Sequence, residues 1–203
     1  MEAKQSISES FDENQSIQVI KEMIYISQKK LKNDGVLFIL WGWIGFYGNI
    51  TGYIVREVIL TYQIQRILNK SGTILGLTAL AYTIYYIWKQ HKKVQTYIGI
   101  SLRYVWISMF VCFVMINLIQ ANVVHKINFD LQHPIFMAII AYATVITGGI
   151  LRYQLVTIGG IIFGLIALLS SYFTLPYQLL LESLAWLVAF IIPGHYLYAN
   201  RKS

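Results

Sequence analysis

Long apolar runs separated by short polar segments are the main pattern of this chain. The first run, 36–55, reads VLFILWGWIGFYGNITGYIV and carries no charge over twenty residues. A helix that rises ~1.5 Å per residue needs about twenty such positions to cross a hydrocarbon core of roughly 30 Å. Further runs follow at 72–88, 98–121, 134–151, 155–173 and 179–198. The pattern predicts an all-α polytopic membrane protein, a bundle of six transmembrane helices within residues 36–198.

The segment before the first run has a different pattern. Residues 1–15 are polar and rich in Ser and acidic side chains, which predicts a disordered tail. Between residues 16 and 34, Ile17, Ile20, Ile24 and Leu31 recur near helical spacing, which predicts an amphipathic helix. Residues 16–31 would bind a cytoplasmic protein partner or anchor the chain to membrane lipids. Gly35 is expected to cap this helix in the left-handed conformation.

Glycines are spaced for close helix packing. A GxxxG pair removes side-chain bulk, so the backbone of a neighbouring helix can approach closely. Across the short link between the fourth and fifth runs, Gly148 and Gly149 are expected to face Gly159 and Gly160. The neighbours are helices of the same chain or of a second copy, which makes a homo-oligomer a candidate. The GxxxG pairs are Gly48/Gly52, Gly72/Gly76 and Gly160/Gly164.

Charge fixes the expected orientation in the membrane. Hydrophobic residues make up 57% and charged residues 12% of the chain, against about 25% charged in soluble domains. Of the sixteen Lys and Arg residues, twelve lie on the side of the two termini and four on the other side. Since positive residues stay in the cytoplasm, both termini are predicted to be cytoplasmic. The net charge of +7 comes from residues that flank apolar runs, so nucleic acid is not a predicted partner.

Polar residues in the outer half of the predicted bundle form the first candidate site. A carboxylate within a span is energetically expensive and raises a functional hypothesis. Glu182 also lies close to a helix start, where a negative charge suits the helix dipole, so a simple capping role remains open. The candidate ligand or pathway residues are Asn49, Asn117, Gln120, Ser170, Ser171 and Glu182.

Pro193, Gly194 and His195 form the second candidate, near the inner end of the last run. Proline removes a backbone donor and permits a kink, so these residues predict a hinge or polar notch. Helix termination beside an interfacial imidazole is the alternative. His133 falls in a predicted polar loop over 122–133 and has no metal-ligand partner at helical spacing.

Motifs of enzymes are absent from the sequence. It contains no nucleophile elbow, phosphate-binding glycine loop or zincin helix. We therefore expect no catalytic residue, cofactor or metal site. The prediction is a non-enzymatic sensing, regulatory or partner-binding module. The alternative is a small-solute transporter or channel that uses the polar cluster around Glu182.

Four segments resemble a known group of proteins. They are EMI at 22–24, LWGW at 40–43, TGGILRYQLVTIGGIIFG at 147–164 and IIPGHYL at 191–197. In these segments the chain resembles uncharacterised multi-spanning inner-membrane proteins of Bacteroidetes-type bacteria, a group without an assigned activity. The resemblance implies a location in the bacterial cytoplasmic membrane.

Overall fold

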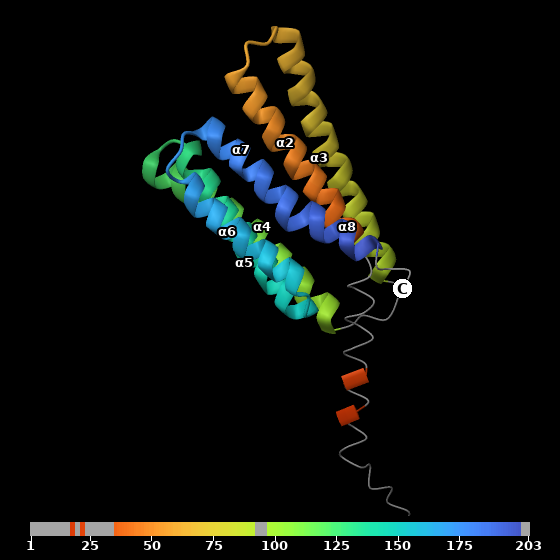
Figure 1. Cartoon of the computed structure of the whole chain (residues 1–203). Coiled ribbons are helices and arrows are strands. Elements are labelled where there is room, and N and C mark those ends of the chain that lie inside the picture. Colours follow the sequence, from red (N-terminus) through yellow and green to blue (C-terminus); the bar gives the residue numbers. More distant parts are fainter. Residues whose placement is uncertain (1–16, 19–20, 23–34, 92–96, 200–203) are drawn as a thin grey trace, which may run out of the picture.

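Helices that run back and forth make up the fold (Figure 1). The computed structural model describes residues 17–18, 21–22, 35–91 and 97–199, and no strand occurs among them. The last three elements follow one another without a break and form one helix, called here the central helix. The elements are α2 (Val36–Glu57), α3 (Tyr62–His91), α4 (Tyr97–Val124), α5 (Phe129–Leu151), α6 (Gln154–Ser170), α7 (Leu175–Trp186), the π-helical turn η1 (Leu187–Ile191) and α8 (Ile192–Ala199).

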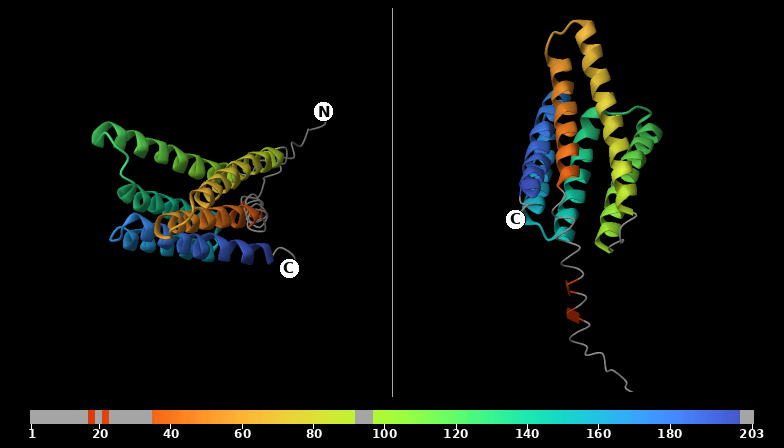
Figure 2. Two further views of the ribbon diagram at one scale, coloured as in Figure 1. Left: turned by 90° about the horizontal axis from the view of Figure 1, so that it is seen from above. Right: turned by 90° about the vertical axis from the view of Figure 1, so that its right-hand side faces the viewer.

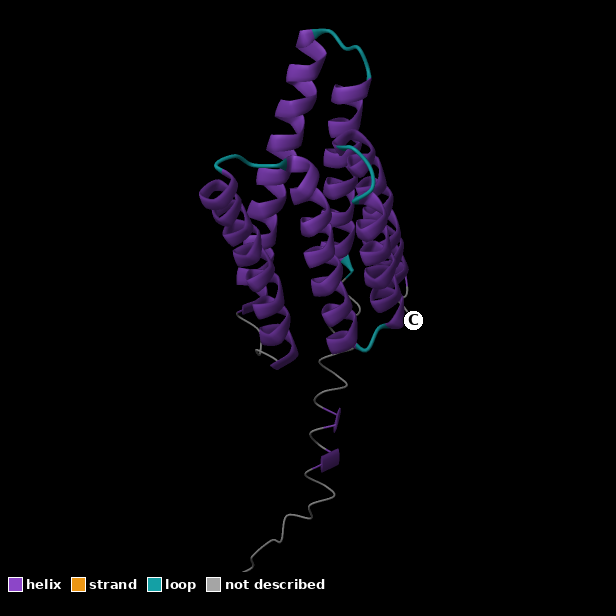
Figure 3. Ribbon diagram, turned by 90° about the vertical axis from the view of Figure 1, so that its left-hand side faces the viewer, coloured by secondary structure: helices purple, strands orange, loops and turns teal. Residues whose placement is uncertain are grey.

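The helices alternate in direction and so define two ends of the bundle. At the terminal end, α2 begins, α5 connects to α6, and α8 ends. At the distal end lie the turns 58–61, 125–128 and 171–174, and the α2–α3 hairpin extends beyond the other two turns (Figures 1 and 3). As a result α5 and α7 both begin at the distal end and run parallel to each other.

Three layers of helices are visible along the bundle axis (Figure 2). The outer layer contains α3 and α4, the middle layer α2 and α5, and the third layer α6 and the central helix. Within these layers α3 packs along α2, α4 along α5, and α5 along α6. The central helix contacts α2, α5 and α6, so it has neighbours on several sides.

Three helices of the described chain are long and apolar enough to cross a membrane. They are Ile98–Val124, Phe129–Leu151 and Leu175–Ala199, and Gln154–Ser170 is a shorter apolar helix. These helices support the prediction of an all-helical membrane protein. The crossing of the membrane by all six helices stays a prediction, because α2 and α3 carry many polar and aromatic side chains.

Glycines let the central helix approach both α2 and α6. A Cβ added at Gly42 of α2 would lie 2.8 Å from Cγ1 of Ile191, and one added at Gly159 of α6 would lie 2.9 Å from Cα of Ala189. Both distances are too short for a methyl group without movement of the neighbour. Gly42 and Gly159 are therefore required for the position of η1.

The expected pairing of glycines across the α5–α6 link is wrong. Gly159 faces Ala189 of η1, Gly148 lies against Thr157, and Gly149 has nothing within 4 Å of its Cβ position. Gly160 packs instead on α5, with its Cβ position 2.8 Å from the Val145 nitrogen. The hairpin does close tightly, but Gly148, Gly159 and Gly160 each meet a larger residue, and no glycine of the link faces another glycine.

The GxxxG pairs of α2 and α3 do not both pack inside the chain. Gly48, Gly72 and Gly76 have nothing within 4 Å of their Cβ positions. The Cβ position of Gly52, in contrast, lies 3.2 Å from Cδ1 of Leu179. Gly35 also differs from expectation, because its φ of −43° is not left-handed. Its Cβ position lies 2.5 Å from the Gly194 carbonyl oxygen, so close contact with α8 explains the glycine.

Several helix boundaries lie outside the predicted runs. The segment 58–71, predicted as an interfacial segment or a helical extension, is helical from Tyr62 onward. The predicted loop over 122–133 is wrong, since α4 continues to Val124 and α5 begins at Phe129. Of the predicted amphipathic helix, residues 17–18 and 21–22 are helical and exposed. The rest of that helix and the predicted tail lie outside the described residues.

Gly160→Ala is predicted to destabilise the protein, because its methyl group would press on the backbone of α5. Overpacking of this kind costs about 1–3 kcal/mol. Gly76→Ala is the matched control, since it adds the same methyl group to open space within a helix and should be neutral or slightly stabilising. Thermal unfolding of both variants in one detergent tests this. A Tm for Gly160→Ala at or above that of Gly76→Ala would contradict the packing.

Candidate functional site

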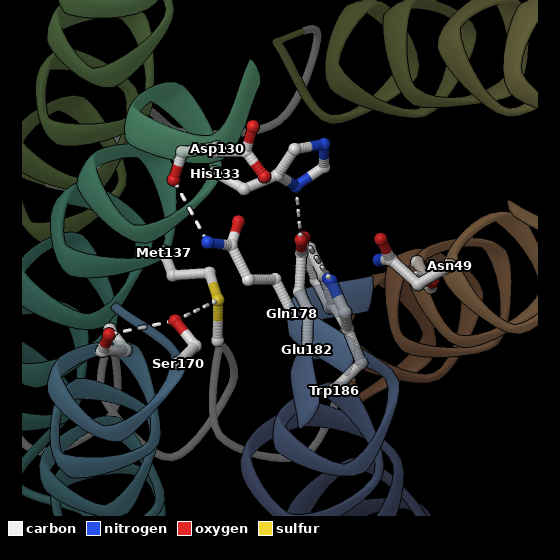
Figure 4. Close-up of polar contacts among 10 residues, drawn as sticks. Asn49, Asp130, His133, Met137, Ser170, Gln178, Glu182 and Trp186 are labelled. Atoms are coloured by element: carbon white, nitrogen blue, oxygen red, sulfur yellow. Dashed lines mark hydrogen bonds and ion pairs between the residues drawn. The ribbon is translucent and has the colours of Figure 1, made fainter. Parts of the chain in front are cut away.

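Polar side chains of α5 and α7 meet at the distal end of the bundle (Figure 4). Asp130 and His133 belong to the first turns of α5, and Gln178 and Glu182 to the first turns of α7. Spacings of three and four residues place each pair on one face of its helix. Because the two helices run parallel, contacts form in the same order along both. We call these four residues the polar ladder.

The distal part of the ladder joins the starts of α5 and α7. Oδ1 of Asp130 accepts a hydrogen bond of 2.9 Å from the Leu175 N–H. Leu175 is the first residue of α7, where backbone donors have no partner within the helix and negative charge is favoured. Asp130 on α5 therefore caps α7 from outside.

Pro134 explains why Gln178 binds the backbone of α5. Proline has no N–H, so Pro134 cannot donate to the carbonyl of Asp130 one turn earlier. Nε2 of Gln178 donates to that carbonyl at 2.9 Å and to the Phe173 carbonyl at 2.8 Å. These two acceptors fix the orientation of the amide. A side chain of α7 thus replaces a backbone hydrogen bond that α5 lacks.

The deeper part of the ladder is the Glu182 carboxylate, which is nearly buried and has two hydrogen-bond partners. Nδ1 of His133 lies 2.9 Å from Oε2 of Glu182, and Nε1 of Trp186 donates to Oε1 at 3.2 Å. The Glu182 side chain is 10% exposed and that of His133 is 27% exposed. His133 therefore connects a nearly buried carboxylate to the surface of the distal end.

Aromatic rings close the core directly below Glu182. The ring of Trp186 lies 4.5 Å from that of Phe190 and 5.6 Å from that of Phe163, measured between centroids. Phe163 and Phe190 are fully buried, and Trp106 of α4 reaches Phe190 from the other side. The polar contacts that continue from the ladder along the central helix therefore end at Trp186.

Glu182 is the one member of the predicted cluster that belongs to the ladder. Asn49 points toward the same region in Figure 4, but its Nδ2 donates to the Gly45 carbonyl of its own helix. The Ser170 hydroxyl donates to the Ala167 carbonyl at 2.8 Å, and the Ser171 hydroxyl donates to the Leu168 carbonyl at 2.7 Å. Each of these three residues thus donates to a carbonyl of its own helix, and the Ser170 hydroxyl also lies 3.6 Å from Sδ of Met137 on α5 (Figure 4).

Asn117 and Gln120 form separate contacts between α4 and the start of α5. Oδ1 of Asn117 accepts a 2.7 Å hydrogen bond from Nε2 of Gln132. Oε1 of Gln120 accepts from the Asn128 N–H at 2.9 Å. The six predicted residues therefore lie in the distal half but do not form one hydrogen-bonded network.

The second candidate, residues 193–195, lies in α8, directly after the π-helical turn η1. The Ile192 N–H donates to the Leu187 carbonyl five residues earlier, and α8 then continues to Ala199. Helix termination at Pro193 is thus wrong. Nδ1 of His195 donates to the Ile191 carbonyl at 2.9 Å, within the same helix.

Asp130, His133 and Gln178 were missed because the predicted spans began too late. Their common signal is a helix start in polar sequence. Asn128 accepts from the Leu131 N–H as an N-cap, and Asp130 follows in the first turn. Gln178 precedes Glu182 by four residues, as Glu182 precedes Trp186, so extending α7 by one turn would have found it.

The site contains a buried hydrogen-bond acceptor that lacks a donor among the described residues. Gln178 is 1% exposed, and its Oε1 has no donor within the described part of the chain. Both oxygens of the Glu182 carboxylate, in contrast, have a partner, His133 or Trp186. Within residues 35–91 and 97–199, no group of three His, Cys, Asp or Glu side chains could hold a metal ion.

Comparisons with protein-family models, with curated proteins and with solved structures give no match for this chain.

His133→Ala and Glu182→Ala are each predicted to lower the free energy of unfolding by about 1–3 kcal/mol, because each leaves a buried polar partner unsatisfied. The double variant should cost less than the sum, with a coupling of about 0.5–3 kcal/mol. A double-mutant cycle from reversible unfolding in detergent measures this coupling. Additive losses would show that the two side chains do not interact.

Gln178→Leu is predicted to cost more in the native chain than in a Pro134→Ala background. The alanine restores an N–H that can donate to the Asp130 carbonyl, so the contribution of Gln178 to that acceptor becomes redundant. The difference should be about 1 kcal/mol, the value of one hydrogen bond. Unfolding free energies of the four proteins give it. Equal losses in both backgrounds would refute the replacement of the backbone bond by Gln178.

Proposed function

We propose that this chain is a six-span protein of the bacterial inner membrane with both termini in the cytoplasm. The alternating directions of the helices support this topology, because α2, α3 and α6 run beside the three long apolar helices. With 17 residues, α6 is ~25 Å long, close to the thickness of a hydrocarbon core. The twelve-to-four distribution of basic residues and the motif resemblance support the orientation and the location.

We infer a sensing or regulatory activity without catalysis, with the polar ladder as the receiving site. The observation that carries this proposal is the position of Glu182, between a partly exposed histidine and a closed aromatic core. A carboxylate at this depth stays paired unless another donor replaces His133 or Trp186. A solute or an altered environment at the distal end can therefore change the contact between α5 and α7.

A transporter is less well supported than a sensor. Alternating access requires polar groups that line a route from one side of the membrane to the other. Below Glu182, Phe163, Trp186 and Phe190 fill the space between the helices, and Ala185 and Ala189 are fully buried beside them. This packing fits a protein that responds to a solute without passing it across.

The output is proposed to involve the predicted amphipathic helix and a cytoplasmic protein partner. This segment immediately precedes Gly35, which packs against Gly194 at the end of the central helix. Residues 17–18 and 21–22 are exposed, as a partner-binding surface requires. The chain thus enters the bundle at Gly35, which contacts the same helix that carries Glu182.

Cysteine accessibility distinguishes a closed core from a transport route. In a chain with Cys112→Ser, a cysteine at the exposed residue Leu131 is predicted to react with a membrane-impermeant thiol reagent from the distal side. Cysteines at Ala185 and Ala189 should react from neither side, because the aromatic core excludes water. Proteoliposomes with reagent inside or outside provide the measurement. Reaction at Ala189 from the terminal side together with reaction at Ala185 from the distal side would support the transporter instead.

A further inference from the structure

The central helix contains a weak point in its backbone hydrogen bonding. The Ile192 N–H bonds the Leu187 carbonyl, five residues earlier instead of four. The next residue, Pro193, has no N–H and cannot donate to Ala189. Two consecutive steps of the regular α-helical pattern are thus missing. Isolated π-turns of this kind recur at functional sites.

The central helix packs along α2 over its whole length, and its two parts differ in the further contacts that they make. On the distal side of η1, α7 is joined to α5 by the polar ladder. On the terminal side, α8 crosses the start of α2 at Gly194, whose Cβ position lies 2.9 Å from the Ile39 nitrogen. Gly35 completes this crossing against the Gly194 carbonyl. Loss of the ladder would therefore release α7 from α5, and a change in the direction of α8 would alter its crossing with the start of α2.

Close backbone contacts flank the π-turn itself. Gly42 of α2 approaches Ile191 on one side, and Gly159 of α6 approaches Ala189 on the other. Because the Ile191 nitrogen, 3.1 Å from the Gly42 Cβ position, and Cα of Ala189 take part in these contacts, side-chain rearrangement alone cannot absorb a displacement of η1. A shift of α7 must instead move η1 along its neighbours and change the direction of α8.

We propose that η1 and Pro193 form the joint through which loss of the His133–Glu182 contact changes the α2–α8 crossing. This inference rests on the proposed function, because it takes the polar ladder as the receiving site. It assigns the crossing as the output, at the point where the predicted cytoplasmic helix enters the bundle. Shifts of about 1–2 Å are typical of such helix movements.

Pairs of spin labels on the full-length chain in lipid nanodiscs test the proposal. With Cys112→Ser, labels at Leu131 and Leu180 report the ladder, and labels at Trp43 and Ala199 report the crossing. These four side chains are exposed. Glu182→Ala is expected to shift or broaden both distance distributions. Glu182→Gln, which keeps the side-chain volume, serves the same purpose if the alanine variant does not fold.

Two further variants make the result specific. Asn117→Ala breaks a hydrogen bond of similar depth between α4 and α5 and should leave the crossing unchanged. Pro193→Ala restores a backbone donor at the joint. In that background, Glu182→Ala is expected to change the ladder distance but not the crossing distance.

Each other outcome overturns a different step. In the native background, a change in the Leu131–Leu180 distance without a change in the Trp43–Ala199 distance refutes the joint and leaves the proposed receiving site intact. If Glu182→Ala changes the Trp43–Ala199 distance equally with and without Pro193, the proline and the π-turn have no role in the transmission. If neither distance changes although unfolding shows that the contact is broken, the sensing function itself fails.

Discussion

The close approach of the central helix to α2 and α6 is the constraint on which the rest of the structure depends. In a membrane, lipid tails are as apolar as leucine, so helices associate through packing and hydrogen bonds. Here Gly42 and Gly159 remove side chains where Ile191 and Ala189 pass. The aromatic rings of Trp186 and Phe190 can then occupy the centre of the bundle, beside Phe163. A larger residue at Gly42 would push the central helix away from α2, and a larger residue at Gly159 would push it away from α6.

That packing also fixes the height at which α7 begins, and the polar ladder depends on this height. Asp130 caps α7 through Leu175, and one turn deeper His133 reaches Glu182. A displacement of α7 by one turn along its axis would break both contacts together. The ladder is thus more informative about helix register than the apolar contacts, which tolerate small shifts. A buried carboxylate is costly unless it is paired, which penalises the wrong registers.

Composition and pattern were sufficient to predict the helices, but not their ends or their neighbours. The apolar runs correspond to α2 through α8, since apolar length is a property of the chain alone. The predicted spans stopped at polar residues, whereas the helices continue past them, and this placed His133 in a loop and excluded Gln178. Which helix a given glycine packs against depends on the tertiary structure and cannot be read from the local sequence. The same GxxxG pattern packs tightly at Gly160 and faces open space at Gly76.

Two prolines within helices have opposite consequences, and the difference separates a rigid part of the molecule from a less constrained one. At Pro134 the freed Asp130 carbonyl is bound by Gln178 from a neighbouring helix, so the missing hydrogen bond becomes a cross-link between α5 and α7. Before Pro193 the backbone widens into a π-turn, and Ile192 bonds five residues back. The first solution ties the distal end together. The second leaves the central helix with fewer hydrogen bonds of its own where it meets α2 and α6. A helix that is cross-linked at one end and interrupted in the middle will respond to a change at the cross-link by bending at the interruption.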